Sequence, residues 1–70
     1  MRYAIVIEKA ENNYSAYVPD LPGCVATGAT VEEVKGQLRE AIAFHLASLR
    51  EDGLALPQPV SRVEYVDVAA

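Results

Sequence analysis

The chain has 70 residues, of which 51% are hydrophobic, and it carries a net charge of −4 and one cysteine. This length allows a single domain, residues 1–70, with a small core, and one cysteine excludes an intramolecular disulfide as a cross-link. The six Lys and Arg residues are scattered and outnumbered by ten Asp and Glu residues, which disfavours binding to the phosphates of DNA or RNA.

The N-terminal hydrophobic run extends from Met1 only to Ile7, because charged residues resume at Glu8 and Lys9. It is shorter than the hydrophobic region of a signal peptide and much shorter than a membrane span. Because a single cysteine is also typical of a reducing compartment, we expect a soluble, cytoplasmic protein that does not associate with a membrane.

The first two elements form a predicted β-hairpin. Residues Arg2–Lys9 have the β-branched and aromatic content of a strand, Ala10–Asn13 are turn formers, and Tyr14–Val18 alternate as a second strand. Both faces of the first strand are largely apolar, since Tyr3, Ile5 and Ile7 alternate with Ala4 and Val6 in the same run. This pattern is typical of a central strand.

The segment Pro19–Gly23 contains two prolines and a glycine, which predicts a loop, and Cys24–Gly28 then returns as a third antiparallel strand. Thr30 is placed as the N-cap of a helix, and Glu33 as the residue that completes a capping box. The sequence therefore predicts a three-stranded meander followed directly by a helix.

The helix is predicted from Val31 to about Glu51, and Gly53 is well placed as the left-handed residue that ends it. Its apolar residues fall at helical spacing and predict one stripe that faces the sheet. The stripe consists of Val31, Val34, Leu38, Ala41, Ile42, His45 and Leu49. His45 is interpreted as a packed residue, since one histidine cannot form a metal site.

The alternation in Val60–Val68 predicts a fourth strand, which follows the helix through a right-handed crossover and lies parallel to the first. The expected fold is α+β, with element order β-β-β-α-β, a four-stranded sheet of order 3-2-1-4 and one helix on one face. This is also the first half of the RNase H-like fold, whose nucleases hold metal ions on carboxylates. Here the middle of the first strand is Ala4-Ile5-Val6-Ile7, so we expect neither catalysis nor a metal or cofactor.

The helix covers one face of this expected sheet and leaves apolar residues exposed elsewhere. A monomer of this size would leave such a patch open, which predicts a homodimer or a higher homo-oligomer. The expected interface consists of Ala4, Val6, Phe44, Leu46, Leu54 and Leu56.

The motif Asp20-Leu-Pro-Gly-Cys24, followed by the helix-capping Thr30, resembles the HicB family. This family is the antitoxin half of the HicA/HicB toxin–antitoxin pairs. The resemblance implies a partial RNase H-like fold without catalysis, which binds a small, basic, mRNA-cleaving HicA-type toxin and covers its active surface. Many HicB proteins carry a further DNA-binding domain, but nothing up to Ala70 resembles one, so DNA binding is not expected.

The expected contacts with this partner are Tyr17, Asp20, Leu21 and Pro22, because a proline-bounded loop loses little entropy on docking. In the alternative interpretation, this loop only links two strands and Leu21 packs under the sheet. An alternative function is that of an RNA-binding or RNA-processing protein derived from a nuclease. Its four tyrosines could stack on bases, but the cationic groove of such proteins is missing.

Overall fold

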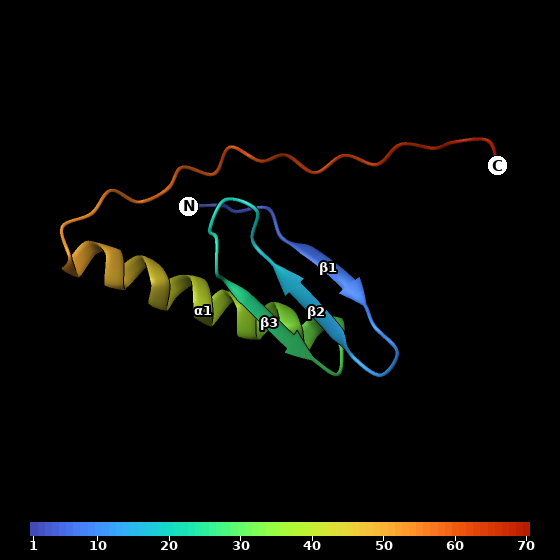
Figure 1. Ribbon diagram of the computed structural model, residues 1–70, viewed down its shortest axis with the longest axis horizontal. Coiled ribbons are helices and arrows are strands. Elements are labelled where there is room, and N and C mark those ends of the chain that lie inside the picture. Colours follow the sequence, from blue (N-terminus) through green and yellow to red (C-terminus); the bar gives the residue numbers. More distant parts are fainter.

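The computed structural model describes residues 1–70 as three short strands, one long helix and an extended C-terminal segment (Figure 1). Strands β1 (Val6–Lys9), β2 (Tyr14–Tyr17) and β3 (Val25–Gly28) form an antiparallel sheet in the order β1-β2-β3. Helix α1 (Val31–Glu51) packs against one face of this sheet, mainly against β3 and β2. The α+β class and the antiparallel meander expected from the sequence are therefore confirmed.

The core lies between α1 and the sheet. The strands pair so that one row of small and branched side chains faces the helix, and this row consists of Ile7, Ala16 and Ala26. The largest side chains that the core removes from solvent are Leu21, Val34 and Leu38. Two of these come from α1 and one from the loop between β2 and β3, so the loop is part of the core.

Both ends of α1 are fixed by the residues expected from the sequence. The Thr30 hydroxyl accepts a hydrogen bond from the backbone N–H of Glu33 at 3.1 Å. The Glu33 carboxylate accepts in turn from the N–H of Ala29, one residue before the position that a strict capping box uses. At the C-terminal end, Gly53 has a φ of +69°, and its N–H donates to the carbonyl of Arg50.

The predicted fourth strand is absent, so the expectation of a four-stranded sheet of order 3-2-1-4 is wrong. Residues 55–70 make no backbone–backbone hydrogen bond, and β1 is consequently an edge strand rather than a central one. In Figure 1 this C-terminal segment, residues 55–70, runs past the N-terminus without a strand beside it. Alternation predicts which side chains share a face, but a strand also needs a neighbour for its backbone.

The first strand is also shorter than expected, because pairing begins at Val6 rather than at Arg2. Tyr17 is the partner of Val6, and β2 ends there because Pro19 follows two residues later. The backbone from Arg2 to Ile5 therefore has no strand beside it.

Candidate functional site

The face of the sheet opposite α1 carries a row of apolar side chains in register across all three strands. Val6 pairs with Tyr17, and Tyr17 pairs with Val25. Tyr17 is 41% exposed and Val25 is 66% exposed, whereas Val6 is half-buried. We call these three residues the open row. An aromatic side chain flanked by two branched ones, without a covering layer, is typical of a surface that binds another macromolecule.

Polar residues border the open row along the sheet. The next row across the strands consists of Glu8, Ser15 and Thr27. A hydrophobic centre with a polar rim is the composition that distinguishes a binding patch from an ordinary exposed side chain. Val25 was not among the contact residues expected from the sequence. Its position in the Cys24-Val25-Ala26 alternation would have placed it on the face opposite the buried Cys24.

The loop between β2 and β3 places two of the expected contact residues differently. Pro22 is exposed at the surface, in the loop that joins Tyr17 to Val25. Leu21 is completely buried, and its backbone N–H donates to Val18 while its carbonyl accepts from Cys24. Its expected role as a partner contact is therefore corrected: Leu21 packs under the sheet and holds the loop in place, as the alternative interpretation had it.

Asp20, another expected contact, binds the C-terminal segment of its own chain. Its carboxylate accepts hydrogen bonds from the backbone N–H of Ser61 at 2.9 Å and from the Ser61 hydroxyl at 2.8 Å. The backbone hydrogen bond, followed by the hydroxyl, lowers the pKa of Asp20 below its ordinary value of 3.8. Asp20 thus attaches the C-terminal segment to the loop between β2 and β3.

The residues expected to form an oligomer interface do not gather in one patch. Val6 lies on the sheet face opposite α1, and Ala4 lies just before β1, outside the sheet. Phe44 is 75% exposed on α1, whereas Leu46 packs against the core. The remaining two residues follow the helix, where one is exposed and the other half-buried; they are Leu54 and Leu56.

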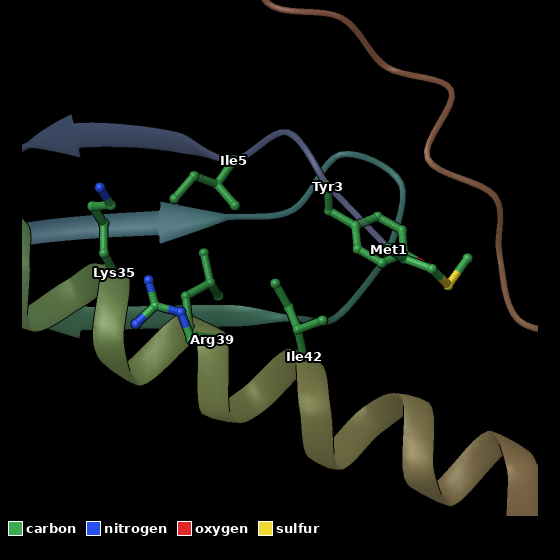
Figure 2. Close-up of a pocket in the computed structure, with 7 residues that line it drawn as sticks. Met1, Tyr3, Ile5, Lys35, Arg39 and Ile42 are labelled. Carbon is green, nitrogen blue, oxygen red and sulfur yellow. The ribbon is translucent and has the colours of Figure 1, made fainter.

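A separate hollow lies between the N-terminal residues and α1, as Figure 2 shows. It has a volume of about 340 Å³, and its floor is apolar, with Tyr3, Ile5 and Ile42 among the lining residues. Lys35 and Arg39 stand on its rim, one helical turn apart, and the only ion pair of the molecule, Arg62 with Glu64, involves neither of them. The hollow therefore combines a hydrophobic floor with two uncompensated positive charges.

The side chains suited to catalysis are dispersed. No three His, Cys, Asp or Glu residues lie close enough to hold a metal ion. Cys24 is buried and its thiol lies 3.9 Å from the carbonyl oxygen of Ala41, and burial raises its pKa. This shift disfavours the reactive thiolate. His45 is half-buried on α1.

Helix α1 does not combine the length and the hydrophobicity that a membrane-spanning helix requires.

Comparison with known proteins agrees with the fold and the motif. The family model described as HicB_like antitoxin of bacterial toxin–antitoxin systems matches residues 3–69. Among solved structures, a chain of a HicA3 and HicB3 toxin–antitoxin complex is similar with a TM-score of 0.70 and 33% identity, over 86% of this chain and 70% of that one.

Curated relatives come from a phage, a bacterium and an archaeon. An uncharacterized 14.9 kDa protein of Haemophilus phage HP1 is 39% identical over 96% of this chain, which spans only 50% of the phage protein. A UPF0150 protein of Helicobacter pylori is 50% identical over 71% of this chain and 69% of its own length. A UPF0150 protein of Archaeoglobus fulgidus is 41% identical over 76% of this chain and 81% of its own length. Because the family model matches nearly all of its residues, the chain belongs to the HicB-like antitoxin family of bacterial toxin–antitoxin systems.

Proposed function

We propose that this chain binds a HicA-type toxin that cleaves mRNA and neutralises it by covering its active surface, with no catalytic step of its own. The observation that carries the proposal is the open row, an apolar strip without a cover in a member of an antitoxin family. The similarity to a chain from a HicA3 and HicB3 complex supports the same class of partner. The site of action would be the cytoplasm, where mRNA is available.

The physical properties of the surface suit a basic protein partner. The chain has a net charge of −4, so opposite charges would steer a basic toxin toward it. Tyr17 offers a large, partly exposed aromatic side chain, the type that most often dominates binding energy. The neighbouring loop is anchored by the buried Leu21, and it would therefore lose little conformational entropy when a partner docks.

The proposal refines the expected contacts. Tyr17 and Pro22 remain proposed contacts, and Val25 joins them because it extends the row across β3. Asp20 is assigned to the attachment of the C-terminal segment.

Coexpression with a HicA-type toxin tests this function. The wild-type chain should restore growth and copurify with the toxin as a stable complex. A Tyr17→Ala, Val25→Lys double variant should weaken binding at least about tenfold, because it removes the aromatic anchor and places an unpaired charge in the contact. Phe44→Lys is the matched control, since it introduces the same charge at an exposed apolar residue on α1 and should leave binding unchanged.

Two results would contradict the proposal. Full affinity of the double variant, checked for folding by circular dichroism, would remove the open row as the binding surface. Failure to bind the toxin, together with RNA binding by the chain alone that persists at moderate salt, would instead favour the RNA-directed alternative.

A further inference from the structure

The unpaired backbone that leads into β1 and the C-terminal segment share one unfilled groove. Residues Arg2–Ile5 line one side of this groove and Ser61–Glu64 line the other, around a volume of about 670 Å³. Neither side makes a backbone–backbone hydrogen bond across it. Unpaired edges of this kind are templates for an additional strand.

Two side-chain contacts hold the C-terminal segment beside the groove instead of inside it. The Tyr3 hydroxyl donates to the carbonyl oxygen of Pro57, and Ser61 donates twice to Asp20. With both contacts made, the segment of the same chain borders the groove and leaves it empty. The groove therefore has room for a strand from another molecule.

The residues after Ser61 have the composition of a strand but none of its contacts. Tyr65 is 93% exposed and Val66 is 82% exposed, and Val63 and Val68 on either side of them are exposed as well. Such a run of exposed β-branched and aromatic side chains is rare on a monomer and typical of a segment that pairs.

The overall dimensions indicate how much surface is left uncovered. The accessible surface is 5522 Å² for a mass of 7.6 kDa, whereas a compact monomer of this mass would expose roughly 4,300 Å². The excess of about 1,200 Å² is larger than the roughly 800 Å² that each partner buries in a standard interface. The radius of gyration is 13.9 Å, against about 11 Å for a compact domain of this length.

We propose that two copies of this chain exchange their C-terminal segments, so that residues 60–68 of each copy fill the groove beside Arg2–Ile5 of the other and extend along β1. Since each segment also borders its own groove, the two segments lie side by side between the two β1 edges. A continuous intermolecular sheet results, and the contact is self-complementary, as a two-fold dimer requires.

The hollow between the N-terminal residues and α1 supplies complementary chemistry for this exchange. A strand added to β1 points alternate side chains toward the helix, where Lys35 and Arg39 are unpaired and the floor is apolar. One alternate set of the segment, Ser61, Val63, Tyr65 and Asp67, carries two apolar side chains and one carboxylate. The other set, Val60, Arg62, Glu64, Val66 and Val68, carries three apolar side chains, and its Arg62 pairs with Glu64.

The test uses the full chain without any toxin, so its result is independent of the proposed function. Sedimentation velocity from about 1 to about 200 µM should show a dimer that dissociates on dilution. Val66→Pro should weaken this dimer at least about tenfold, because proline cannot donate a ladder hydrogen bond. Ala69→Pro is the matched control, as it lies beyond the pairing residues and should leave the dimer intact.

Hydrogen exchange separates pairing between copies from pairing within one chain. Amides of residues 62–68 should become protected as the protein concentration rises through the dimerisation range. Lys35→Glu with Arg39→Glu should weaken the dimer, and adding Glu64→Lys with Asp67→Lys should restore it. A chain that stays monomeric at the highest concentration, a Val66→Pro dimer of unchanged affinity, or protection independent of concentration would each overturn the exchange.

Discussion

The body of the molecule and its C-terminal segment have similar hydrophobic alternation but different structures. In the body, residues 3–53, every strand has a neighbour and the loop and helix close a core around Leu21 and Leu38. In the C-terminal segment, the equally strand-like run Val60–Val68 has no neighbour and remains exposed. The comparison teaches that an alternating pattern needs a backbone partner and an apolar surface before it becomes a strand.

The largest difference should appear when an apolar side chain is shortened in each region. Leu38→Ala should lower the free energy of unfolding by about 2–5 kcal/mol, because it opens a cavity in a core of few residues. Val66→Ala should change it by less than about 0.5 kcal/mol at concentrations where the chain is monomeric. Urea unfolding of both variants measures this, and equal losses would show that the C-terminal segment packs on its own body.

Glycines inside the body offer a second, smaller contrast. A Cβ atom on Gly28 would lie 3.0 Å from the backbone nitrogen of Val34, where β3 passes the start of α1. Gly28→Ala should therefore destabilise the body by about 1–3 kcal/mol. Gly36→Ala meets no atom within 4 Å and should stabilise α1 by up to about 1 kcal/mol. Thermal unfolding that gave both variants the same sign would contradict this account of the strand–helix contact.

The N-cap residue of α1, Thr30, should contribute to the free energy of unfolding by an amount typical of helix caps. Thr30→Ala removes the hydroxyl that accepts from Glu33, and it should cost about 1 kcal/mol of stability. Thr30→Ser keeps an oxygen at the same place and serves as the control. If chemical denaturation cannot distinguish Thr30→Ala from the wild type, the cap does not help to fix the helix against the sheet.

The smallest effect is expected at the contact that joins the two regions. Because the folded chain lowers the pKa of Asp20, its hydrogen bonds to Ser61 should be complete above pH 3.8 and lost as the pH falls through the lower, folded-state pKa. Asp20→Asn should speed exchange of the Ser61 amide at neutral pH without changing the melting temperature of the body. A Ser61 amide signal in NMR spectra that is unaffected by acid or by this variant would remove the attachment.

The body could be predicted because its signals are local. Thr30, Glu33 and Gly53 mark the ends of α1 within one turn, and Pro19–Gly23 separates two strands that adjoin each other in the chain. The spacing of Val34 and Leu38 likewise predicted which face of the helix is buried. Such features require only neighbouring residues, and each was placed within one or two positions.

The fourth strand and the contact residues could not be predicted in the same way. Whether Val60–Val68 pairs depends on the position of a distant edge, and Ser61 is instead bound by Asp20, 41 residues earlier in the chain. The burial of Leu21 follows from the way its loop folds inward, which the prolines alone do not specify. Val25 could have been placed on the open face by its alternation with Cys24, but nothing in a four-residue strand shows that its neighbours across the sheet are Tyr17 and Val6.

The central claim, that this family member works by binding a protein across the open row, is tested most directly by hydrogen exchange on its complex with a HicA-type toxin. The backbone amides around Tyr17 and Val25 should become more protected when the toxin is added, while those of α1 around Phe44 should be unchanged. Protection confined to α1, or no protection at saturating toxin, would contradict the claim.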